Sequence, residues 1–205
     1  MLRLDPVIAV RALDGFRLWP IAAVEPEWMV LDGSLDGPQI GTAVAVIAAY
    51  NSHSQAEPGD AKSPKGFLRD LLKTDSPIAE GGLRLTDTTT GAVVVPGCCF
   101  GLESWREWYG AVKDERPWLG HDPWPTATRS GSELVVTADN DAQGSAVIVA
   151  PAEELLRLWA TVERHLVEFH RAAARWAAAQ IPGQARAVSH TLARVLDLRP
   201  IDPAQ

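Results

Sequence analysis

The segment PAEELLRLWATVERHLVEFHRAAARWAAAQ, residues 151–180, does more than any other part of the chain to decide the fold. Its large apolar residues recur at alternating spacings of four and three, which is the periodicity of one helix face. Pro151 suits a first helical turn, where its missing N–H costs nothing. We therefore predict a long helix over residues 151–180 and a shorter one over 184–196. The apolar stripe consists of Leu155, Trp159, Val162, Leu166, Phe169, Ala173 and Trp176.

This stripe can be buried in two ways. It can pack on the chain's own sheet and on the helix predicted over 184–196, which is the preferred interpretation. Alternatively, a stripe with a 3.5-residue period can pair with a second copy of the chain. Such a homodimer would form through Leu155, Trp159, Val162, Leu166 and Phe169.

Upstream of the long helix, the sequence has the alternation and the turn residues of antiparallel strands. Residues 83–95 and residues 133–149 each predict a hairpin, and residues 7–22 predict another. Residues 102–113 predict a short helix with aromatic residues on one face. We therefore predict an α+β fold, with an antiparallel sheet of several hairpins and the long C-terminal and shorter helices packed on it.

Length and composition fit one globular unit. The chain has 205 residues, of which 46% are hydrophobic and 22% are charged, so it can bury a sizeable core. We predict a single domain over residues 1–200. The polar segment 51–65 (NSHSQAEPGDAKSPK) is a loop that can set off a small N-terminal lobe. The apolar segment 40–50 before it is compatible with a strand or a helix.

Charge and hydropathy restrict the partners. A net charge of −7 disfavours nucleic acid and favours a basic protein partner. Arg3 and Asp5 interrupt the first apolar run, which is unlike a signal peptide, and the longest apolar run, 43–49, is too short to cross a bilayer. We expect a cytoplasmic protein with no membrane partner.

Residues 93–124 contain both cysteines and four of the eight tryptophans. Cys98 and Cys99 lie near a predicted helix start, which lowers a thiol pKa, and His53 or His121 could supply a base. A cysteine-dependent enzyme or a thiol sensor is therefore one hypothesis, and plain packing of a tight turn is the simpler one. Adjacent cysteines on an extended segment point to opposite sides, and no CxxC spacing is present, so we predict no metal and no cofactor.

The tryptophans provide the other hypothesis. Trp118 and Trp124 lie in a proline-rich loop with His121 and Asp122, a composition typical of a protein-binding hot spot or a ligand pocket. We predict a binding surface made of these four residues and Trp105 of the adjacent helix. Because no complete catalytic constellation is present, a non-enzymatic protein-binding module is preferred over an enzyme.

The block VPGCCFGLESWREW, residues 95–108, followed by PWLGHDP, residues 117–123, resembles a group of actinobacterial proteins that have no known activity. The resemblance covers residues 83–180. It implies a hairpin, a Gly-Cys-Cys turn, a tryptophan-bearing helix, a second hairpin and a long C-terminal helix. The group is similar in style to small acidic immunity proteins, which bind a toxin and carry out no chemistry. By analogy, the protein would neutralise or regulate a partner.

Overall fold

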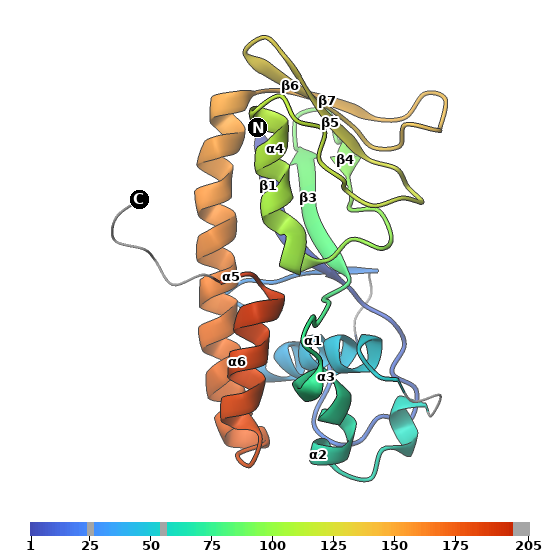
Figure 1. Ribbon diagram of the computed structural model, residues 1–205, viewed down its shortest axis with the longest axis vertical. Coiled ribbons are helices and arrows are strands. Elements are labelled where there is room, and N and C mark those ends of the chain that lie inside the picture. The colour runs from blue at the N-terminus through green and yellow to red at the C-terminus, as the bar shows by residue number, and fades with distance from the viewer. Residues whose placement is uncertain (24–26, 54–56, 199–205) are drawn as a thin grey trace.

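The computed structural model describes residues 1–23, 27–53 and 57–198 (Figure 1). Residues 54–56 of the polar segment and residues 199–200 of the predicted domain lie outside these ranges. The described part of the chain forms two antiparallel sheets and several helices, which confirms the α+β prediction. The strands, however, form a four-stranded and a three-stranded sheet, where a single sheet was expected.

The four-stranded sheet has the order β2-β1-β3-β4. β1 pairs with both β2 and β3 in antiparallel register, so that Leu4 lies opposite Leu85. The hairpin predicted over 83–95 is confirmed as β3 and β4. The strands are β1 (Leu2–Ala9), β2 (Trp28–Val30), β3 (Gly81–Asp87) and β4 (Val93–Val94).

The predicted hairpin over residues 7–22 is wrong. β1 pairs instead with the distant β3, and residues 16–22 form no strand. The aromatic side chains of residues 16–22 belong to a buried aromatic cluster. The Trp19 ring lies 4.8 Å from the Phe16 ring and 5.6 Å from the Trp176 ring, measured between centroids. The apolar residues after the predicted turn therefore pack against the C-terminal helix that carries Trp176, and they do not pair as a strand.

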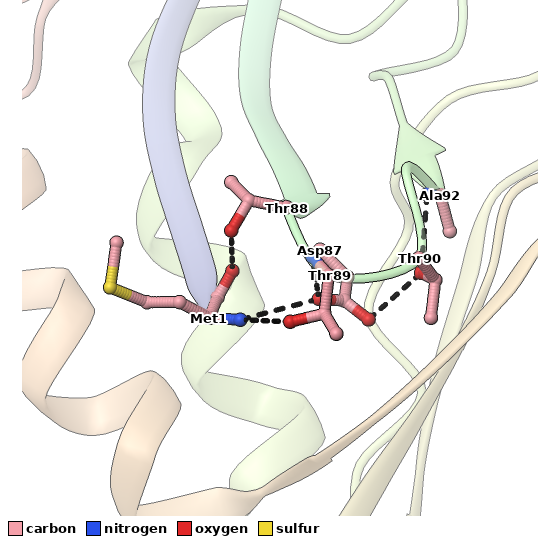
Figure 2. A network of polar contacts seen from close by, with 6 residues as sticks. All are labelled: Met1, Asp87, Thr88, Thr89, Thr90 and Ala92. Atoms are coloured by element: carbon pink, nitrogen blue, oxygen red, sulfur yellow. Dashed lines mark hydrogen bonds and ion pairs between the residues drawn. The ribbon is translucent and has the colours of Figure 1, made fainter.

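The N-terminus is held against the β3–β4 turn by a polar network (Figure 2). The Met1 amino group donates to Thr89 Oγ1 at 2.6 Å, and the Thr88 amide donates to the Met1 carbonyl at 3.0 Å. Asp87 accepts from the Thr89 amide and from the Thr90 hydroxyl, at 2.9 and 2.8 Å. These hydrogen bonds hold the pKa of Asp87 below its usual value. The network fixes the register in which β1 enters the sheet.

The three-stranded sheet has the order β5-β6-β7. Its strands are β5 (Thr126–Ser130), β6 (Glu133–Thr137) and β7 (Val147–Pro151). β6 and β7 confirm the hairpin predicted over 133–149, whereas β5 was not anticipated. Leu134 and Ile148 face the core, and Val147 and Val149 face solvent, as strand alternation requires.

The long helix is confirmed as α5 (Ala152–Gln180), followed by α6 (Ala185–Val195). α5 runs along most of the long axis of the molecule, with α6 beside it (Figure 1). Every residue of the predicted stripe is buried by the chain itself, mainly against β1 and α6. The five side chains of the alternative homodimer, Leu155, Trp159, Val162, Leu166 and Phe169, are thus already covered within one chain, as the preferred interpretation expects.

The remaining helices are shorter. The ambiguous segment 40–50 is helical and belongs to α1, where Asp36 and Gln39 form a capping box. The helix predicted over 102–113 begins as a 3-10 turn and continues as α4. In the described part of the chain, no helix combines the length and the apolar composition needed to span a bilayer. The shorter helices are α1 (Gly37–Tyr50), η1 (Pro58–Asp60), α2 (Pro64–Phe67), α3 (Arg69–Lys73), η2 (Leu102–Glu107) and α4 (Trp108–Val112).

Candidate functional site

The Gly-Cys-Cys turn lies side by side with the segment 119–121. The Gly97 amide donates to the Leu119 carbonyl at 3.0 Å. Cys98 and His121 exchange two backbone hydrogen bonds, of 2.6 and 3.1 Å, and so form an isolated antiparallel bridge. We call these three hydrogen bonds the backbone bridge. It fixes Cys98 next to His121 although 22 residues separate them in sequence.

Glycine is required on both sides of the backbone bridge. Gly120 has φ of +96°, and a Cβ added there would lie 2.6 Å from the carbonyl carbon of Gly97. A Cβ on Gly97 would lie 2.5 Å from the backbone nitrogen of His121. Because only glycine lets the two backbones approach this closely, Gly97 and Gly120 are part of the site's construction.

The backbone bridge brings two thiols and an imidazole together. Cys98 Sγ lies 3.5 Å from Cys99 Sγ, 3.3 Å from His121 Nδ1 and 3.8 Å from His121 Nε2. The expectation that the two cysteines point to opposite sides is therefore wrong. It assumed an extended segment, but Cys99 has φ of +60°, and this left-handed residue turns its side chain back toward Cys98.

His121 is contacted by an acid and an aromatic ring as well as by the thiol. Asp122 Oδ2 lies 3.2 Å from His121 Nδ1, and the Trp118 ring centroid lies 5.9 Å from that of His121. The Asp122 side chain is 93% exposed and the His121 side chain is 44% exposed. Solvent, ions and partners can therefore reach the cluster from outside.

The surroundings of the Cys98 thiol raise its pKa above the usual value. Its hydrogen bond with Cys99 contributes most to raising the pKa of Cys98, and burial, Cys99, Asp122 and Glu80 act in the same direction. The sequence predicted a lowered thiol pKa from a nearby helix start. The helix begins at Leu102 as predicted but opens with a 3-10 turn, and the hydrogen bond to Cys99, burial and the negative charges of Asp122 and Glu80 raise the pKa of Cys98.

Of the five residues predicted to form a binding surface, four are exposed at least in part and Trp105 is not. Trp118 and Trp124 are 46% and 42% exposed, and they border a groove of about 560 Å³. Trp105, in contrast, is fully buried, and its indole donates to the Leu196 carbonyl at 3.1 Å. Trp105 is therefore a core residue and not part of the surface. The groove is also lined by Arg116, Pro117, Thr126, Ala127, Thr128 and Asn140.

The loop that carries these indoles is also held at its far end. The Trp124 amide donates to Asp139 Oδ1 at 3.3 Å, and the Asn140 amide donates to the Trp124 carbonyl at 2.9 Å. We call the residues Trp118, His121, Asp122 and Trp124 the aromatic loop. It is anchored to the Gly-Cys-Cys turn on one side and to the β6–β7 turn on the other.

Sequence reasoning missed a second group of residues beside the thiols. Arg11 forms a bidentate ion pair with Glu80, at 2.5 and 2.8 Å, next to a small cavity of about 160 Å³ that Tyr50 also lines. Glu80 pairs with Gly101 in an isolated strand bridge. Burial raises the pKa of Tyr50, and Glu80 and Cys99 raise it further. The group comes from three distant segments, so no local pattern could reveal it.

His53, the other histidine considered as a base, does not join the cluster of thiols and imidazole. It is exposed, and its backbone amide donates to Asp70 Oδ2 at 3.1 Å.

Comparison of the chain with protein-family models, with curated proteins and with solved structures finds no match. The chemistry of the site therefore rests on its own geometry.

Proposed function

We propose that this protein is a non-enzymatic binding protein whose partner docks on the aromatic loop. The observation that carries the proposal is the exposure of Trp118 and Trp124, at 46% and 42%, on a loop held by backbone hydrogen bonds at both ends. A tryptophan in a fixed loop loses little conformational entropy when a partner covers it, and it contributes a large contact area.

The charges that flank the loop favour a partner with a basic face. Acidic residues outnumber basic ones on the segments next to it, and the whole chain has a net charge of −7. Complementary charge speeds association and discriminates against acidic competitors. Such a surface suits an immunity-like or regulatory protein that neutralises a partner by covering it. The flanking residues are Asp114, Glu115, Asp139 and Asp141, against Lys113 and Arg116.

A double substitution tests this proposal. In Trp118→Ala/Trp124→Ala, we expect capture of the partner from the native extract to fall at least about tenfold, as loss of hot-spot residues does. The melting temperature should change little, since both side chains are half-exposed. Leu156→Ala is the matched control, because Leu156 is 42% exposed on α5. Unchanged capture, or equal loss in the control, would contradict the proposal.

A thiol sensor is the second candidate function. The 3.5 Å separation of the Cys98 and Cys99 sulfurs favours it. A peroxide would accept two electrons, its O–O bond would break, the two thiol protons would leave with the oxygens as water, and one S–S bond would form. The raised pKa of Cys98 counts against this oxidation and against a cysteine-dependent enzyme alike, because both start from a thiolate. The neighbouring second sulfur is what favours the sensor over the enzyme.

Differential alkylation with mass spectrometry tests the sensor. Brief peroxide treatment should protect both cysteines from alkylation, and dithiothreitol should restore labelling of both. In Cys98→Ser, Cys99 should lose this reversible protection. Oxidation of Cys99 that proceeds unchanged in Cys98→Ser would contradict a paired thiol mechanism.

A further inference from the structure

We propose that Cys98, Cys99 and His121 bind one Zn²⁺, or a divalent cation of the same borderline-soft class, with the Asp122 carboxylate holding the imidazole. This inference goes beyond the proposed partner binding and does not depend on it. The three side chains place one ligand atom each within 4.8 Å of one another.

The separations between these ligand atoms approach those of a tetrahedral zinc site. With Zn–S bonds of about 2.3 Å and Zn–N bonds of about 2.05 Å, a tetrahedral ion holds two sulfurs about 3.8 Å apart, and a sulfur and a nitrogen about 3.6 Å apart. The two sulfurs lie 3.5 Å apart, and Cys98 Sγ lies 3.8 Å from His121 Nε2. The third separation, between Cys99 Sγ and the imidazole, is within 4.8 Å. Cys98 Sγ lies nearer Nδ1, at 3.3 Å, so seating the ion requires a rotation that turns Nε2 toward the sulfurs.

The imidazole has the partner that a ligating histidine needs. Asp122 Oδ2 lies 3.2 Å from His121 Nδ1, so Nδ1 can donate to the carboxylate while Nε2 turns its lone pair to the ion. A carboxylate behind a ligating imidazole fixes its tautomer and raises its basicity. The ion displaces the two thiol protons into solvent. The resulting two thiolates and one imidazole select zinc-like cations over Mg²⁺ and Ca²⁺, which prefer oxygen.

The backbone fixes the ligands before any ion arrives. The backbone bridge joins Cys98 to His121, and the left-handed Cys99 turns the second thiol to the same side. Cys99 is exposed and Cys98 is half-buried, so the ion can enter from solvent. With three protein ligands, the fourth position is left to water or to a group brought by a partner, as in an open zinc site.

Cobalt titration tests the site, because Co²⁺ takes tetrahedral zinc sites and reports thiolate bonding in its spectrum. The reduced full-length protein is titrated with Co²⁺ under nitrogen, and Zn²⁺ is then added as competitor. We expect one Co²⁺ per chain, a thiolate-to-cobalt charge-transfer band in the near ultraviolet, and strong visible bands of a tetrahedral ion. Zn²⁺ should displace Co²⁺, and excess Mg²⁺ should not.

Single substitutions identify the ligands. Cys98→Ser and Cys99→Ser should each weaken the charge-transfer band and lower the affinity. Loss of a residue that only orients a ligand lowers metal affinity about 10–100-fold. His121→Gln removes a ligand itself, so it should lower the cobalt affinity by more than this. His53→Gln is the matched control and should bind like the wild type. Circular dichroism checks that each variant is folded. Because the Cys99 side chain is exposed, we expect Cys99→Ser to fold like the wild type.

Two results would overturn the site. One is the absence of a charge-transfer band in the folded, reduced protein at cobalt concentrations well above its own. The other is an affinity in His121→Gln equal to that of His53→Gln. The Trp124→Ala variant keeps all three ligands and also the Trp118 ring beside His121. It should bind cobalt like the wild type while partner capture falls, so failure of partner binding and failure of the metal site are distinguishable.

Discussion

Substitution of Leu166 by alanine tests whether the α5 stripe is buried within one chain. Leu166 is completely buried, at the middle of the helix. Leu156 is the matched control, because it lies in the same helix but is 42% exposed. The chemical change and its effect on helix propensity are the same at both positions, so the difference between the two variants reports burial.

The expected magnitudes follow from these exposures. Leu→Ala removes three carbon groups, worth about 2.4 kcal/mol at about 0.8 kcal/mol each when fully buried. The cavity left behind raises the cost at Leu166 to about 3–5 kcal/mol. For a chain of this size that corresponds to a fall in melting temperature of about 6–20 °C, at about 2–4 °C per kcal/mol. At Leu156 the cost should be about 1 kcal/mol or less.

Urea unfolding followed by tryptophan fluorescence measures both variants, at protein concentrations that differ by a factor of about 100. Intramolecular burial predicts midpoints that do not depend on protein concentration. If the stripe instead joined two chains, the midpoint of the wild type would rise with concentration, because association stabilises by mass action. A concentration-dependent midpoint, or equal destabilisation by Leu166→Ala and Leu156→Ala, would refute the reasoning.

Three further predictions concern other parts of the molecule. Burial raises the pKa of Glu103 above its usual value, so the folded protein binds that proton more tightly than the unfolded chain does, and stability falls as pH rises through the raised pKa. Glu103→Gln should therefore be more stable than the wild type at neutral pH, and urea titrations should show the difference vanishing below the usual glutamate pKa. Gly120→Ala should destabilise by about 1–3 kcal/mol, because its φ is +96°. Gly183→Ala, where an added Cβ meets no atom within 4 Å, should cost far less, and equal thermal shifts would contradict this. Trp105→Phe should cost about 1–3 kcal/mol more than Trp159→Phe by calorimetry, because it leaves the Leu196 carbonyl without its donor, whereas the Trp159 indole N–H has no acceptor in the described structure.

Local patterns in the sequence predicted the elements whose partners are near in the chain. The period of the stripe predicted α5, and strand alternation around a turn predicted the β3–β4 and β6–β7 hairpins. β1 was misassigned because its partner β3 begins 72 residues after β1 ends, and nothing local marks that pairing. Non-local pairing is set by the packed core as a whole and not by turn residues.

The residues of the candidate site were named from the sequence, with no metal expected, but their mutual geometry was not predicted. Cys98, Cys99 and His121 were all named from the sequence, yet the extended backbone assumed for the cysteines placed the thiols apart. The left-handed conformation of Cys99 and the glycines at 97 and 120 reverse that conclusion. Trp105 was misplaced for a related reason, because apolar residues on a short helix look the same whether a core or a partner covers them.

The backbone bridge has a thermodynamic consequence for the two proposed ligands. The cation would be held by Cys98 and His121, and the partner would cover Trp118, whose ring packs beside His121. Two ligands that restrict the same short loop are coupled, and the coupling is reciprocal: if the cation alters partner affinity by some factor, the partner alters cation affinity by that factor. A coupling of about 1–3 kcal/mol, corresponding to about 5–150-fold, would let the concentration of a trace metal govern how much of the partner is captured.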